Sequence, residues 1–184
     1  AAADCLFLAK DFVLAEKAYA ALQKDAADTK ISEDAFHQRI LSLLETSDEI
    51  SDWNRTTEVI EDAARSNRTR TKEPIWSAIW SLVEDMRKAQ RPTDAERLLA
   101  RLDPLTRGAR VDYDLRFTWQ RALLAIANNN PTEASRLAAE IDRKLSNLPA
   151  GATPDELSKA VPELRGHAAL LKARTSLNAG AAKG

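Results

Sequence analysis

The scarcity of glycine constrains this chain more than any other feature. The first of its five glycines is Gly108, so the preceding residues lack the amino acid that tight β-hairpin turns favour. Alanine, the strongest helix former, occupies 33 of the 184 positions. This combination nearly excludes an all-β fold and makes a mixed α/β fold unfavourable. We therefore expect an all-α protein without a β-sheet.

A helical pattern recurs in four places along the chain. Each copy has a small residue followed, four and seven positions later, by further apolar or ring residues. The four copies are Ala15–Tyr19–Leu22, Thr56–Ile60–Ala63, Ala95–Leu99–Leu102 and Ala134–Ala138–Ile141. This spacing places each trio on one face of a helix. The small residues lie 41, 39 and 39 positions apart, and a ring residue or proline precedes each by three positions: Phe12, Trp53, Pro92 and Pro131.

A second amphipathic helix is predicted in front of each copy. Apolar stripes indicate helices over 33–46, 74–90 and 112–128, and the end of one over 2–9. Their stripes contain, in order, Phe36, Ile40, Leu43 and Leu44; Trp76, Ile79, Trp80 and Val83; and Leu115, Trp119, Ala122 and Ile126. One helix pair cannot bury its apolar face alone, whereas stacked neighbours can. We expect antiparallel pairs of about 40 residues that stack as an α-solenoid.

Capping residues predict where these helices begin and end. Asn130 before Pro131, with Glu133, is typical of a helix start, and Thr93 with Glu96 suggests a capping box. Thr153 with Glu156 suggests another capping box. The acids that follow Ser32 are expected in a first helical turn.

The predicted helix boundaries divide the chain into two parts. Residues 1–148 would hold the repeats, the first of them truncated. Residues 149–184 would form a long C-terminal helix with a frayed tail that packs on the last repeat. Pro162 is expected to break or restart this helix.

The clearest copy resembles the tetratricopeptide repeat. Phe12, Ala15, Tyr19 and Leu22 are similar to the second-helix signature of that family, and 130–134 resembles the same turn in the fourth copy. Trp76 with Ile79 and Trp80 is similar to the start of the family's first helix. The period of 39–41 residues exceeds the family's 34. The resemblance implies a right-handed superhelix whose first helices line a concave groove that holds a peptide or partner helix.

The same resemblance implies which side chains line the groove. They would be His37, Ser77, Ser81, Glu84, Arg116 and Gln120. Trp119 lies on the same helix as Arg116, so it could pack in the core or present its ring to a partner. This surface is polar and mixed in charge, which suits a charged peptide better than an apolar helix. The implied partner is a protein or peptide, and self-association stays open.

Catalytic chemistry finds little support in the sequence. None of the serine-hydrolase, zinc-peptidase or phosphate-loop motifs occurs, and the single Cys5, expected to be buried, cannot form an internal disulfide. Asp34 and His37 could share a weak ion pair or chelate a metal, but an exposed helix surface explains them better. We therefore expect no enzyme, no metal and no cofactor. A helical enzyme domain is the weakest alternative.

The expected role is a non-enzymatic scaffold within a larger, bacterial-looking protein. The main alternative is a structural or regulatory domain that packs on its own chain or self-associates. The opening residues, AAADCLFLAK, do not resemble a signal peptide, and no apolar run approaches the roughly 18 residues that span a bilayer. Membrane insertion is therefore not expected, and the compartment stays open between cytoplasm and periplasm.

The charge distribution predicts that nucleic acid is not the partner. The formal net charge is -1, and the acidic first third is balanced by a basic remainder. A basic run of Arg65, Arg68, Arg70 and Lys72 is the one candidate for an anionic ligand. In anisotropy titrations at about 150 mM salt, we expect no sub-micromolar binding to random duplex or single-stranded DNA or RNA. Tight binding that is lost when this run is replaced would contradict the expectation.

Overall fold

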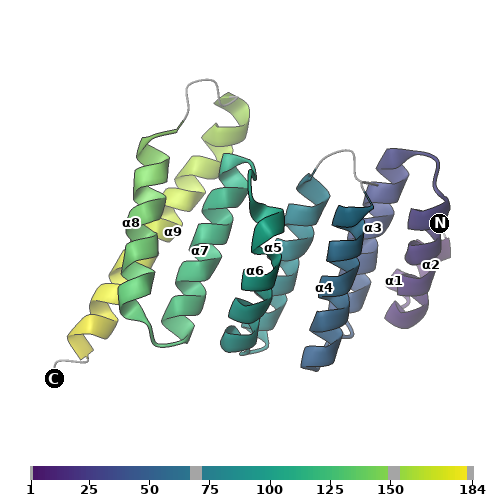
Figure 1. The fold of residues 1–184 in the computed structure, drawn as a ribbon, viewed down its shortest axis with the longest axis horizontal. Coiled ribbons are helices and arrows are strands. Elements are labelled where there is room, and N and C mark those ends of the chain that lie inside the picture. Colours follow the sequence, from purple (N-terminus) through teal and green to yellow (C-terminus); the bar gives the residue numbers. More distant parts are fainter. Residues whose placement is uncertain (1, 67–71, 149–153, 182–184) are drawn as a thin grey trace. The chain divides into compact units, whose positions relative to one another are not determined.

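All regular structure in the described part of the chain is helical. The computed structural model describes residues 2–66, 72–148 and 154–181. The helices, drawn in Figure 1, are α1 Ala2–Leu8, α2 Phe12–Asp25, α3 Thr29–Leu44, α4 Ile50–Arg65, α5 Glu73–Lys88, α6 Pro92–Thr106, α7 Val111–Ala127, α8 Pro131–Ser146 and α9 Pro154–Ala181. No strand occurs among these residues, so the expected all-α class is confirmed.

The chain divides into two compact units. The first, Ala1–Arg107, holds α1 to α6, and the second, Gly108–Gly184, holds α7 to α9. In the first unit each helix contacts the next one, and additional contacts join α3 to α5 and α4 to α6. In the second unit α7, α8 and α9 all contact one another. The boundary expected near residue 148 stays a prediction.

The repeated stripe predicted from the sequence forms the core. The small positions Ala15, Thr56, Ala95 and Ala134 are completely buried. Of the eight residues that follow them in the four copies, all are buried except Leu22, which is 41% exposed. Burial at every small position lets a neighbouring helix approach closely. The stripe on α4, α6 and α8 is therefore confirmed in full, and the stripe on α2 is confirmed up to Tyr19.

Three helix connections share one backbone geometry. Lys10, Gln90 and Asn129 have φ values of 62°, 60° and 60°, and each stands directly before an N-cap residue. At each turn the amide of the N-cap residue bonds a carbonyl five residues earlier, at 3.0, 3.0 and 2.7 Å. This left-handed closure usually contains glycine or asparagine. Here Lys10 and Gln90 also adopt this left-handed conformation. The scarcity of glycine therefore disfavours β-hairpins but does not prevent these turns between helices.

The structure confirms some predicted helix starts and corrects others. The Asn130 side chain caps α8 by accepting a hydrogen bond from the Glu133 amide at 3.1 Å. The prediction of a capping box at Thr93 is wrong, because α6 begins at Pro92 and its N-cap residue is Arg91. The acids after Ser32 do not lie in a first turn either. α3 begins at Thr29, capped by Asp28, and buried Ser32 donates a hydrogen bond to the Gln23 carbonyl at 3.1 Å.

The last helix runs for 28 residues without interruption. Pro162 lies inside α9, so the prediction that it breaks the helix is wrong. The missing amide of a proline costs one backbone bond, which a long helix with many remaining bonds can tolerate. α9 packs on both α7 and α8 through Ala168 and Leu171. Thr153 and residues 182–184 of the predicted tail lie outside the described residues.

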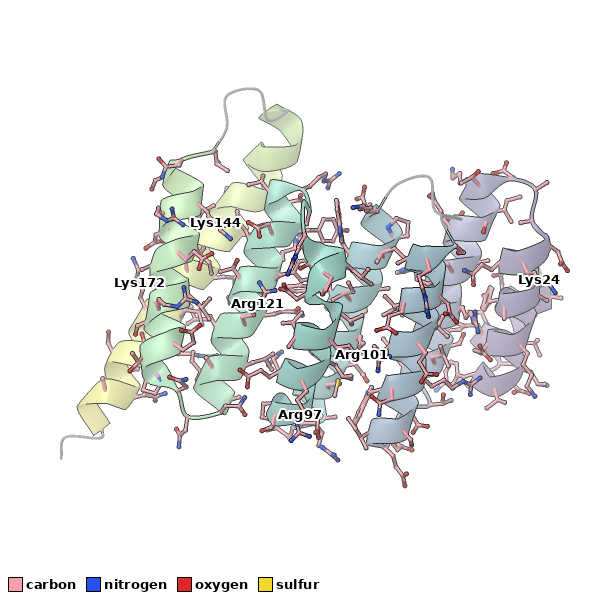
Figure 2. All side chains as sticks on the ribbon, in the orientation of Figure 1. Lys24, Arg97, Arg101, Arg121, Lys144 and Lys172 are labelled. Carbon is pink, nitrogen blue, oxygen red and sulfur yellow. The ribbon has the colours of Figure 1, made fainter. Side chains whose placement is uncertain are left out.

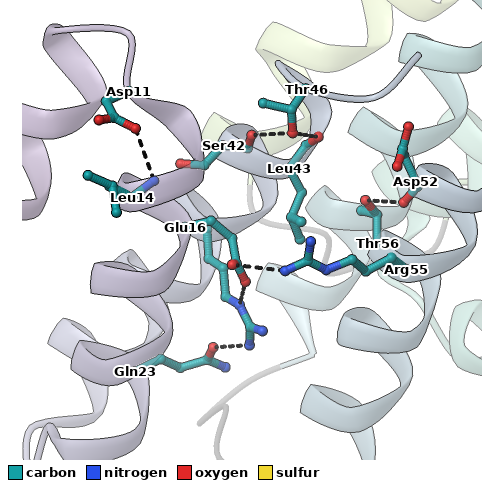
Figure 3. Close-up of polar contacts among 11 residues, drawn as sticks. Asp11, Leu14, Glu16, Gln23, Ser42, Leu43, Thr46, Asp52, Arg55 and Thr56 are labelled. Carbon is teal, nitrogen blue, oxygen red and sulfur yellow. Dashed lines mark hydrogen bonds and ion pairs between the residues drawn. The ribbon is translucent and has the colours of Figure 1, made fainter. Parts of the chain in front are cut away.

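An ionic network around one buried carboxylate joins α2, α3 and α4. The Glu16 carboxylate, whose side chain is 7% exposed, accepts hydrogen bonds from Arg39 at 2.8 Å and from Arg55 at 3.1 Å (Figure 3). Arg39 also donates to the Gln23 side chain. The Arg55 side chain is 60% exposed, so its pair contributes less than the pair with Arg39, which is 24% exposed. Losing Arg39 would leave the buried carboxylate poorly compensated, so this residue is the main ionic link between α2 and α3.

One hydrogen bond between side chains links α1 to α2. The Tyr19 hydroxyl donates to Asp4 at 2.8 Å. Burial of Tyr19, followed by this hydrogen bond, raises the pKa of Tyr19 to about 12. Cys5, one position after Asp4, is exposed, so the prediction that it lies in the core is wrong. The short helix α1 places Ala3, not Cys5, against α2.

Ion pairs also link the helices of the second unit. Lys144 on α8, labelled in Figure 2, lies 2.8 Å from Asp114 on α7 and 2.9 Å from Glu140 on its own helix. Lys172 on α9, labelled in the same figure, pairs with Asp142 on α8. These side chains keep appreciable exposure, so each pair contributes only modestly to stability. The apolar cluster beneath them supplies most of the packing between α7, α8 and α9.

We predict that Trp76 is a core residue of the first unit. Its ring is 6% exposed, and its indole nitrogen donates to the Leu105 carbonyl at 3.2 Å. Trp76→Ala should lower the free energy of unfolding by about 3–5 kcal/mol in denaturant melts. Trp80→Ala, one turn later on α5 but only half-buried, is the matched control and should cost clearly less. A loss under about 1 kcal/mol for Trp76→Ala would contradict its place in the core.

A candidate binding groove between α3 and α5

A groove of about 450 Å³ lies between the C-terminal halves of α3 and α5. The residues that line it are Leu41, Leu44, Glu45, Trp80, Ser81, Glu84, Asp85 and Lys88. We call this site the α3–α5 groove. It lies within the first unit, between two helices that contact each other directly. Both helices belong to the set that the sequence predicts as the first member of a pair.

Helical periodicity explains how these side chains meet. Leu41 and Leu44 are three positions apart and follow the outer edge of the apolar stripe of α3. On α5, Ser81, Glu84 and Lys88 recur at intervals of three and four, so they form one line along the helix. The apolar side chains that line the groove, Leu41, Leu44 and Trp80, are half-buried, whereas the neighbouring Ile40 and Val83 are fully buried. The groove is therefore a partly apolar surface with a polar margin.

The carboxylates of the groove have different partners. Glu84 makes two hydrogen bonds with the Arg87 guanidinium, at 2.7 and 3.0 Å, and this pairing raises the pKa of Arg87. Asp85 accepts a hydrogen bond from the Trp53 indole nitrogen at 2.9 Å. Glu45, the exposed C-cap of α3, makes no ion pair among the residues described. Two of the three carboxylates thus face the groove without a bonded cation.

The groove collects part of the predicted partner-binding set. Ser81 and Glu84 line it, and Ser77 lies one turn before Ser81 on the same helix. His37 lies one turn before Leu41 on α3, half-buried and outside the lining. The residues that sequence reasoning missed are Leu41, Leu44, Glu45, Trp80, Asp85 and Lys88. Leu41 and Leu44 could have been found, since they follow His37 at four and seven positions.

The other three predicted residues lie on α7 in the second unit. Arg116 is half-buried, whereas Gln120 is only 1% exposed and presents almost no surface to a partner. Trp119 stacks on His167 of α9, with ring centroids 4.0 Å apart and an angle of 2° between the planes. One face of the indole is therefore covered by the chain's own last helix. As a partner-binding set, these three residues stay a prediction.

A second, smaller cavity of about 280 Å³ lies near α2, α3 and α4. Its lining includes Gln23, Lys24 and Arg39. Arg39 is held by Glu16 and Gln23 in the buried network described above. Gln23 and Arg39 are therefore engaged in holding helices together, and Asp62 pairs with Arg65 on its own helix. The α3–α5 groove is larger and contains two carboxylates without a bonded cation, so it is the better candidate for a ligand.

Features typical of other functions are not found in the described part. No group of three or more histidine, cysteine, aspartate or glutamate side chains could hold a metal ion there. None of the helices described has the length and apolar character that crossing a bilayer demands. In the basic run, Arg68 and Arg70 lie outside the described residues, while Arg65 pairs with Asp62 at 2.5 Å.

Comparison with known proteins gives no relative. No protein-family model matches the chain, and neither a curated protein nor a solved structure matches it significantly. The resemblance to the tetratricopeptide repeat therefore rests on the residues alone.

We predict that Trp119 and His167 are energetically coupled. A double-mutant cycle of Trp119→Ala and His167→Ala, measured by denaturant melts, should give a coupling energy of about 0.5–1.5 kcal/mol for a stacked ring pair. Pairing Trp119→Ala with Ser176→Ala, at an exposed position further along α9, is the control and should give additive losses. Additivity for Trp119 with His167 would show that the stacking does not hold α7 to α9.

Proposed function

We propose that the protein is a non-enzymatic interaction module of helical repeats. In this proposal the helix pairs are antiparallel and stack as a solenoid of tetratricopeptide type. The α3–α5 groove binds a segment of a partner protein. The observation that carries the proposal is the groove itself, because it lies between two first helices and includes Ser81 and Glu84.

Three features of the fold support the repeat architecture. The buried small residue recurs in four second helices, and the same left-handed turn closes three connections. The contacts from α3 to α5 and from α4 to α6 link equivalent helices of consecutive pairs. In a repeat array each unit contacts its neighbours, so equivalent helices line one continuous surface. Such a surface suits the binding of an extended or helical segment.

The alternative is a structural or regulatory domain that uses the same surface within its own chain or with another copy. It shares the fold and differs only in what fills the groove. A captured segment from a different protein favours the scaffold, whereas a captured segment of the same protein favours the alternative. The test must therefore identify the molecule that lies in the groove.

Site-specific photocrosslinking in the cells that produce the protein provides that test. The photoreactive residue p-benzoylphenylalanine replaces Ser81 in the groove or, as a control, exposed Glu58 on α4. We expect adducts to one defined protein from position 81 only. The captured protein should bind the purified module, and Ser81→Trp, which fills the groove, should weaken that binding about tenfold or more. Equal adducts from both positions, or full binding by Ser81→Trp, would contradict the proposal.

A further inference from the structure

We infer that the α3–α5 groove recognises a cationic segment, through lysine or arginine side chains whose aliphatic stems lie on its apolar lining. This inference rests on the proposed function and specifies the chemistry of the partner. It follows from two properties of the lining, an apolar surface made by Leu41, Leu44 and Trp80 and an excess of carboxylates beside it.

The apolar part of the lining fits the stem of a long basic side chain. Leu41, Leu44 and Trp80 are all half-buried, so each keeps surface that a ligand can cover. Lysine and arginine bury their methylene groups on such surfaces while the charged end stays near polar groups. A carboxylate side chain has fewer methylene groups to place on this surface.

The charges beside this surface favour the same partner. The lining contains three carboxylates, Glu45, Glu84 and Asp85, and one ammonium group, Lys88. Arg87 neutralises Glu84 through its two hydrogen bonds, but the bond from the Trp53 indole to Asp85 leaves that carboxylate negatively charged. Glu45 has no bonded cation among the described residues. With Glu84 paired, the carboxylates of Glu45 and Asp85 outnumber the single ammonium group of Lys88 by one, which leaves a net attraction for positive charge.

The surrounding helices do not offset this attraction. Arg39, one of the two cations of α3, is directed to Glu16 and Gln23 on α2 and does not line the groove. The first unit as a whole, residues 1–107, contains 20 acidic and 16 basic residues, which adds a weaker attraction at longer range. An acidic peptide, an anionic membrane surface or nucleic acid would each be repelled here.

A peptide panel tests the sign of the preference on the intact 184-residue chain. Three short peptides share the same leucine positions and carry lysine, glutamine or glutamate at all others. Binding is followed at about 150 mM salt by the amide NMR resonances of the protein. We expect the lysine peptide to bind at least about tenfold more tightly than the glutamate peptide. Its shifts should be confined to α3 and α5 around Leu41, Leu44 and Ser81.

Variants that remove a carboxylate distinguish binding in the groove from attraction of the peptide to the overall charge of the protein. Glu45→Gln and Asp85→Asn should each weaken the lysine peptide about threefold, as expected for partly exposed charge pairs. Asparagine keeps an oxygen that can accept the Trp53 hydrogen bond, and thermal melts check that the fold is retained. Glu58→Gln, an exposed carboxylate on α4, is the matched control and should leave binding unchanged.

Other results of the peptide panel and of the variants would overturn the inference. Equal binding of all three peptides in the groove would overturn the cationic preference and leave the proposed function standing. A lysine preference that survives both charge-removing variants, or shifts spread over α4, would also overturn the inference. If no peptide perturbs α3 or α5, the inference fails. The photocrosslinking from position 81 then decides separately whether the groove binds any partner.

Discussion

The structure depends on close approach between helices at four equivalent small residues. Ala15, Thr56, Ala95 and Ala134 have no exposed surface, and each lies on the buried face of its helix. A larger side chain there would push the neighbouring helix away, because protein interiors are packed at crystal-like density. Threonine is tolerated at position 56 because its hydroxyl donates to the Asp52 carbonyl in the same helix, at 3.1 Å. The repeated spacing in the sequence thus records a repeated packing requirement.

Core positions can be predicted from the sequence because burial is periodic. Every position that the repeated spacing selects on α4, α6 and α8 is buried. Leu22 is the exception on α2. It lies near the end of that helix and is 41% exposed, whereas its counterparts Ala63, Leu102 and Ile141 are buried. Periodicity reports which face of a helix is apolar, but it does not report whether a neighbour covers that face along its whole length.

Helix ends and single polar residues are harder to predict, because local signals compete. Ser32 and the acids after it are typical of a helix start, yet Asp28 caps α3 and Ser32 bonds to α2. Gln120 has the character of a groove residue on a polar face and is buried. Asp85 and Glu45 carry no motif, and only the packing of α3 against α5 brings them beside Trp80. Such juxtapositions depend on tertiary contacts, which one sequence read alone does not specify.

The two cavities described above differ in whether their charged groups are already engaged in contacts within the protein. Near α2, α3 and α4, Arg39 already has a buried partner, and withdrawing it from Glu16 to bind a ligand would leave a carboxylate that is 7% exposed and poorly solvated. In the α3–α5 groove, Glu45 is exposed and Asp85 is bonded to a neutral indole, so a cation can approach without breaking an ion pair. Ligand binding is favoured where the protein's own contacts are least disturbed. The α3–α5 groove meets that condition, and the cavity beside the ionic network does not.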